Sequence, residues 1–100
     1  MKTFDIFKNE IIFGDLYLEK EYGKSDYLDI VQLLKVVTKG NNTCYIKKII
    51  GTYFPHRDEN KNISLTNNDK NSTTVLYKYF YIPIHNPLKE QLNKLLKNEN

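Results

Sequence analysis

The residues from position 73 to position 84 constrain the fold more than any other part of the chain. Aromatic and aliphatic side chains fill most of these positions, and tyrosines recur at every second one, at Tyr77, Tyr79 and Tyr81. Successive side chains of a strand point to opposite sides of a sheet, so the spacing predicts a strand with a tyrosine row on one face. The opposite face would carry Leu76, Lys78, Phe80 and Ile82.

Other segments also favour strands. Residues 3–7 and 11–18 are rich in β-forming side chains and flank a polar turn at 8–10, which predicts an N-terminal hairpin. Residues 43–54 are typical of a further strand.

Residues 25–40 can be interpreted in two ways. As a helix, Ser25 would cap the start, Asp26 and Asp29 would lie in the first turn and Gly40 would end it. Alternatively, the many β-branched residues and the turn at 40–42 suit a hairpin that leads into the next strand. We favour the helix, because its start and stop signals agree with each other.

The last segment predicts a helix. Asn86 is a capping residue and Pro87 suits a first helical position. Leucines follow at helical spacing, at Leu88, Leu92, Leu95 and Leu96. The whole chain then forms one α+β domain, residues 1–100, in the order ββαββα. We expect a small antiparallel sheet of four to five strands with two helices on one face, the second of which is the amphipathic helix at the C-terminus.

The polar loop 55–72 is unusually long for a compact domain, and such loops are either functional or disordered. Its only large apolar residues, Ile63 and Leu65, could form a short edge strand. Charges of both signs suit protein recognition, and the residues that we expect to contact a partner are His56, Arg57 and Lys61. The simpler interpretation is a disordered loop without a role.

The charges are unevenly distributed along the chain. Four lysines and seven acids in residues 1–30 give −3, and eleven basic residues and five acids in residues 31–100 give +6. This asymmetry permits an anionic partner, but it is weaker than the basic footprint of a typical nucleic-acid-binding domain.

The single cysteine and the lack of a signal-peptide pattern predict a cytoplasmic location. Cys44 is the only cysteine, so no intrachain disulfide can form and a reducing compartment fits best. Charged residues interrupt the first fifteen positions, which excludes a signal-peptide core, and no apolar run is long enough to span a bilayer. We expect no membrane association.

No catalytic or metal motif is convincing. The run His56-Arg57-Asp58 imitates part of a kinase loop, but the chain has no glycine-rich phosphate loop. Cys44 with His56 or His85 matches no local thiol-enzyme signature and no zinc-ligand spacing. The acids Asp5, Asp15 and Glu19 could pair for hydrolysis, and a solvated face explains them equally well. We expect no enzyme activity, no metal and no cofactor.

The origin of the chain is suggested by composition. Alanine is absent, and lysine, asparagine, isoleucine and tyrosine, whose codons are rich in A and T, dominate. This is typical of an AT-rich genome, including that of a phage, a virus or a mobile element.

These patterns favour a non-enzymatic binding module that occupies a protein or nucleoprotein of the host cell. Its target would be host machinery such as a defence system, and the tyrosine row and the polar loop would be its contact surfaces. The alternative is a single-stranded nucleic-acid-binding domain that stacks bases on the tyrosines, with phosphate contacts at Lys47, Lys48 and Lys78. A third hypothesis is a small hydrolase or thiol enzyme. The tyrosine row could also simply pack beneath the helices. An exposed edge strand, or apolar surface on the last helix, could also support a homodimer.

Overall fold

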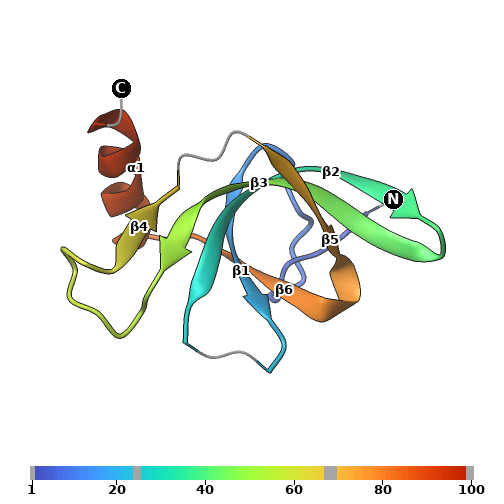
Figure 1. Ribbon diagram of the computed structural model, residues 1–100, viewed down its shortest axis with the longest axis horizontal. Coiled ribbons are helices and arrows are strands. Elements are labelled where there is room, and N and C mark those ends of the chain that lie inside the picture. Colours follow the sequence, from blue (N-terminus) through green and yellow to red (C-terminus); the bar gives the residue numbers. More distant parts are fainter. Residues whose placement is uncertain (1, 24–25, 67–69, 99–100) are drawn as a thin grey trace.

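The computed structural model describes residues 2–23, 26–66 and 70–98 (Figure 1). They form six strands, one short 3₁₀ helix and one α-helix. The elements are β1 (Leu16–Glu21), β2 (Leu28–Lys39), β3 (Asn42–Tyr53), β4 (Ile63–Leu65), β5 (Asn71–Val75), η1 (Leu76–Lys78), β6 (Tyr79–Pro83) and α1 (Leu88–Asn98).

All strands belong to one antiparallel sheet with the order β4-β3-β2-β1-β6. The long strand β3 pairs with β5 along its first half and with β4 at its end. The β2–β3 hairpin extends to one end of the molecule, and α1 lies at the other (Figure 1). No helix in the described ranges is long and apolar enough to cross a membrane.

The sheet buries side chains on both faces, so the molecule has two apolar cores. Tyr17, Val31 and Tyr81 pack on one face, together with Ile11 from the segment before β1. Leu18 and Ile30 pack on the other face, where Leu92 of α1 covers them. Neighbours in sequence such as Tyr17 and Leu18 therefore serve different cores, as strand geometry requires.

The predicted helix over residues 25–40 is wrong, because most of that segment is strand β2. Ser25, its expected cap, lies outside the described residues. The central strand β2 is buried from both sides, so the adjacent residues Ile30 and Val31 are both inaccessible. The pairing of β2 with β3 is irregular at Leu34, which shifts the alternation of side chains between the two faces. Val36 therefore lies on the same face as Val31. Together these effects place apolar residues at spacings that imitate a helix. The hairpin alternative is confirmed: Lys39 pairs with Asn42 across the turn.

Two glycines permit close backbone approaches, one in the turn before β3 and one within β3. Gly40 begins the two-residue turn before the strand with a φ of 61°, a conformation that suits glycine. Gly51 lies where β4 approaches, and a β-carbon there would collide with the carbonyl oxygen of Ser64. Only a residue without a side chain lets β4 pair this closely.

The remaining predictions are confirmed in part. The strand over 43–54, the short edge strand at Ile63 and Leu65, and the C-terminal helix are all present. The N-terminal hairpin is reduced to one bridge between Phe4 and Glu10. The fold is thus α+β, with a six-stranded sheet and one α-helix in place of the four to five strands and two helices expected.

Candidate functional site

The segment before β1 folds into a compact loop, residues 3–15, which we call the N-terminal loop. The Asp5 carboxylate accepts hydrogen bonds from the backbone N–H groups of Phe7, at 2.8 Å, and Asn9, at 3.1 Å. Lys8 adopts a positive φ of 65° inside this turn. Because one carboxylate holds two backbone groups, a segment without regular structure keeps a defined shape.

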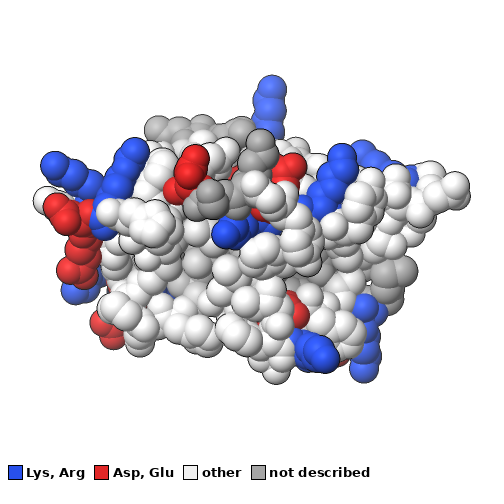
Figure 2. Space-filling model, turned by 90° about the horizontal axis from the view of Figure 1, so that it is seen from below, with Lys and Arg blue, Asp and Glu red and all other residues white. Residues whose placement is uncertain are grey.

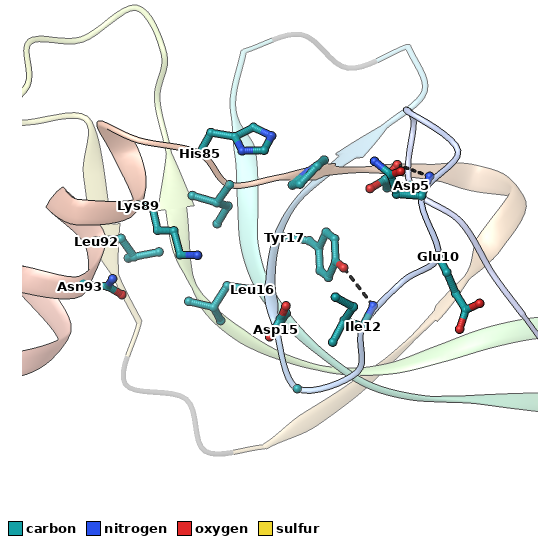
Figure 3. Close-up of a pocket in the computed structure, with 14 residues that line it drawn as sticks. Asp5, Glu10, Ile12, Asp15, Leu16, Tyr17, His85, Lys89, Leu92 and Asn93 are labelled. Atoms are coloured by element: carbon teal, nitrogen blue, oxygen red, sulfur yellow. Dashed lines mark hydrogen bonds between the residues drawn. The ribbon is translucent and has the colours of Figure 1, made fainter.

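The N-terminal loop is fastened to the sheet at several points. The Ile6 backbone N–H donates to the Tyr81 carbonyl oxygen at 3.0 Å, and the Gly14 N–H donates to that of Leu33 at 2.7 Å. The Tyr17 hydroxyl accepts a hydrogen bond from the Ile12 N–H (Figure 3). Ile11 is buried in the core between these attachments. The loop is therefore part of the folded domain.

The N-terminal loop exposes much of its apolar surface to solvent. Eight large apolar or aromatic residues are exposed in the described part of the chain, and five of them lie within positions 4–13. We call these five the N-terminal apolar surface; they are Phe4, Ile6, Phe7, Ile12 and Phe13, with exposed fractions of 39% to 61%. Exposed large apolar side chains concentrated in one loop make that loop a candidate interaction site.

A pocket of about 470 Å³ lies between the N-terminal loop and α1 (Figure 3). Asp5 and Glu10 line it from the loop, and His85 and Lys89 line it from the chain around the start of α1. A second pocket of about 350 Å³, which we call the aromatic pocket, lies between the loop and β6. Phe4, Ile6, Tyr22, Tyr45 and Phe80 contribute to its walls. The N-terminal loop thus forms one wall of both pockets.

A buried polar cluster joins three strands. Lys47 on β3 contacts Glu19 on β1, with 2.5 Å between Nζ and Oε1, and their side chains are 7% and 1% exposed. The Tyr81 hydroxyl on β6 donates to Glu19 Oε2 at 2.6 Å. Burial and the Glu19 charge raise the pKa of the Tyr81 phenol, which keeps it protonated as a donor. The cluster joins β1, β3 and β6 through polar contacts among side chains that are all buried.

Asp29 lies beside this cluster, directly opposite Glu19 in the β1–β2 register. Burial raises the pKa of its carboxyl above 3.8, the nearby Glu19 charge adds to the rise, and Lys47 opposes it. Ionised Asp29 therefore costs stability at neutral pH. That cost disappears as the pH falls through the raised pKa of Asp29 in the folded state to below its pKa in the unfolded state.

We expect Asp29→Asn to raise the free energy of unfolding by roughly 0.5 kcal/mol at pH 7, after allowance for solvent screening. At pH 3, where the carboxyl is protonated in both states, the gain should vanish. Urea unfolding of both proteins at the two pH values measures this difference. An equal gain at both pH values would show that the charge of Asp29 is not the cause.

The predicted tyrosine row is not formed. The 3₁₀ helix η1 interrupts the expected strand and places Tyr77 at the surface, where it is 69% exposed. Tyr79 is partly buried beneath the Lys47 ammonium, which lies 5.4 Å from its ring centre. Tyr81 is 3% exposed and belongs to the core. The three side chains therefore do not make a continuous platform.

The predicted phosphate contacts are also separated. Lys47 is buried against Glu19, so its ammonium is not presented to a nucleic-acid backbone. Lys78 is exposed on η1, and Lys48 is partly exposed on β3. On the face seen in Figure 2, basic and acidic side chains are interspersed among uncharged ones. No continuous basic stripe is seen on that face.

The polar loop is anchored to α1. Gln91 of α1 donates from Nε2 to the Glu59 carbonyl oxygen at 2.5 Å and to Asn62 Oδ1 at 2.7 Å. The predicted contact residues are exposed in the turn after β3; they are His56, Arg57 and Lys61. The Arg57 guanidinium lies 3.8 Å from the centre of the Phe54 ring. Positions 67–69 of the predicted loop lie outside the described residues.

The candidate thiol-enzyme residues are dispersed. Two of the candidate hydrolase acids, Asp5 and Asp15, line the same 470 Å³ pocket, whereas Glu19 is buried against Lys47. Cys44 lies near the start of β3 and His56 follows its end, so most of a twelve-residue strand separates them. At about 3.3 Å per residue this is far beyond hydrogen-bond reach. His85 lines the 470 Å³ pocket, which Cys44 does not. Within the described residues, no group of three or more His, Cys, Asp or Glu side chains could hold a metal ion.

The N-terminal apolar surface was missed by sequence reasoning. Its residues were assigned to hairpin strands, in which one face would be buried. The available signal was the density of phenylalanine and isoleucine within positions 4–13. No family model, curated protein or solved structure matches this chain. Its function must therefore be argued from its own residues.

Proposed function

We propose that the protein is a non-enzymatic binding module that acts by occupying a protein partner through the N-terminal apolar surface. The observation that carries this proposal is the exposure of five large apolar side chains on a loop held in a fixed shape. Burying such residues against a partner is favourable, by about 25 cal/mol per Å². A preorganised loop also loses little conformational entropy on binding.

A protein partner is favoured over a nucleic acid or a membrane by the charges near this surface. The loop carries the acids Asp5, Glu10 and Asp15 against one lysine, Lys8, and Lys2 just before the loop pairs with Glu10. Phosphate backbones and anionic lipid surfaces would be repelled by the net negative charge of this loop. The broken tyrosine row and the buried Lys47 give the nucleic-acid alternative no further support.

The composition supports a phage, a virus or a mobile element as the source of the protein. We accordingly propose host machinery, such as a defence system in the cytoplasm, as the class of target. A small binding domain inhibits such machinery by covering a surface that the target needs, and this requires no catalytic group.

Affinity capture of the tagged protein from a lysate of its host cell, with and without nuclease, tests the proposal. We expect a stoichiometric protein partner that survives nuclease and is lost from the Phe7→Ser/Ile12→Ser variant. Recovery of nuclease-sensitive nucleic acid, with equal yield from both proteins, would contradict it. Tyr27→Ser removes an exposed aromatic outside the N-terminal loop and serves as the matched control.

A further inference from the structure

The pocket of about 470 Å³ between the N-terminal loop and α1, which we call the loop–helix pocket, has a volume typical of ligand sites. Apolar side chains from the loop, the sheet and α1 line it, among them Ile12, Tyr17 and Leu92. Ile12 is also one of the five exposed residues of the N-terminal apolar surface. The loop–helix pocket therefore adjoins the surface through which we propose that the partner binds.

The Asp5 carboxylate lines this pocket and has no cationic partner. Asp5 is only 9% exposed, and its Oδ1 atom accepts both hydrogen bonds from the backbone, those of the Phe7 and Asn9 N–H groups. Within the described residues, Oδ2 accepts no hydrogen bond and is not occluded from solvent. Neither of the two ion pairs among these residues includes Asp5. A largely buried carboxylate without a counterion is unfavourable, so a ligand that supplies a cation would be stabilised here.

The other charged groups of the loop–helix pocket also favour a cation. Glu10 and Asp15 line it from the N-terminal loop, and Glu10 lies 3.7 Å from the Lys2 ammonium outside the pocket lining. On the opposite wall, Lys89 reaches towards the pocket from α1, and His85 lies just before the helix (Figure 3). Three carboxylates thus face one lysine and one histidine, so the lining is net negative whether or not the histidine is protonated.

We infer that the loop–helix pocket receives a basic side chain of the protein partner, whose charged group contacts the free Oδ2 atom of Asp5. This inference rests on the proposed function and names a group that the partner inserts beside the N-terminal apolar surface. The apolar lining suits the methylene stem of a lysine or arginine, and the carboxylates suit its charged end. An acidic or uncharged side chain would leave the Asp5 charge without a counterion.

The aromatic pocket is a poorer site for a cation, although Asp5 lines it as well. The other side chains of its lining are uncharged. Two of its rings already have a lysine ammonium near them: Lys20 lies 5.9 Å from the centre of the Phe80 ring, and Lys47 lies 5.4 Å from that of Tyr79. A further cation in the aromatic pocket would be repelled by these two charges, so the loop–helix pocket is favoured.

NMR titration with acetyl-arginine amide and with acetyl-citrulline amide, its uncharged isostere, tests this inference. Arginine is the basic probe because its weakly hydrated guanidinium forms two parallel hydrogen bonds with a carboxylate. We expect the arginine probe to shift the amide signals of Asn9 and Lys89 and to bind at least about tenfold more tightly than the citrulline probe.

Asp5→Asn removes the charge and keeps a side-chain oxygen that accepts the two backbone N–H groups, so the N-terminal loop should keep its shape. We expect this variant to bind the arginine probe less than about threefold more tightly than the citrulline probe. Asp58→Asn removes a carboxylate that does not line the pocket, and it should leave the binding of both probes unchanged.

Lys89→Met tests the same inference without altering the N-terminal loop. It removes the opposing positive charge from an exposed position of α1. We expect it to strengthen binding of the arginine probe about twofold to threefold and to leave the citrulline probe unaffected.

Equal binding of the two probes to the wild-type protein, a tenfold preference that survives Asp5→Asn, or weaker arginine binding by Lys89→Met would overturn the inference. Phe7 does not line the loop–helix pocket. If the probes bind equally while the partner is still lost from Phe7→Ser/Ile12→Ser, only the assignment of a basic side chain is wrong and the proposed function stands.

Discussion

Lys47→Met will lower the free energy of unfolding by about 3–5 kcal/mol, because it leaves the Glu19 carboxylate buried without its cation. The Glu19 side chain is 1% exposed, so water cannot replace the lost partner. Tyr81 still donates to the other carboxylate oxygen, but one neutral hydrogen bond does not balance a buried charge. Urea unfolding measured by far-ultraviolet circular dichroism gives the value.

A double-mutant cycle separates the ion pair from simple loss of packing. In Glu19→Gln/Lys47→Met, the Gln side chain still accepts from Tyr81 and no charge remains in the cluster. We expect this double variant to be at least about 1 kcal/mol more stable than the sum of the single losses predicts. Lys48→Met, on the next residue of β3, is the control and should change stability by less than about 1 kcal/mol. Additive single losses would show that the two charges do not interact.

Leu92→Ala will lower the free energy of unfolding by about 2–5 kcal/mol, because it opens a cavity where α1 covers the sheet. Leu92 is almost fully buried and packs with Leu18, Ile30 and Ile84. The same denaturant measurement, with hydrogen exchange of the α1 amides, shows whether the helix detaches as the sheet remains folded.

Two further substitutions on α1 control this result. Leu92→Met conserves volume and should cost less than about 1.5 kcal/mol. Lys94→Ala alters an exposed position of the same helix and should change stability by less than about 0.5 kcal/mol. If Leu92→Ala cost no more than Lys94→Ala, the packing of α1 on this face would be wrong.

The elements with simple periodicity could be predicted from the sequence, and those with irregular pairing could not. Residues 43–54 and the leucines of α1 show the spacing of an ordinary strand and helix, and both predictions are confirmed. Strand β2 misled the prediction because it is buried from both sides and changes its alternation at Leu34. Pairing with β3 along nearly its whole length outweighs local helix signals, and such long-range pairing is invisible in a local window.

The candidate site depended even more on tertiary structure. Alternating tyrosines predicted one row, but the turn of η1 moves Tyr77 to the surface while Tyr81 enters the core. Lys47 looks like any surface lysine in the sequence, and its burial follows from a contact with Glu19, 28 positions away. The exposure of Phe7 and Ile12 results from a carboxylate-held loop that residue types alone do not specify.

The dissociation constant of the purified partner for the wild-type protein and for Phe7→Ser/Ile12→Ser, measured at low and at high salt, tests the central claim most directly. We expect at least a 30-fold loss in the variant, equivalent to about 2 kcal/mol, with little dependence on salt. Tyr27→Ser should bind as tightly as the wild-type protein. Unchanged affinity in the variant, or affinity that falls steeply as salt rises in all three proteins, would show that the N-terminal apolar surface is not the contact.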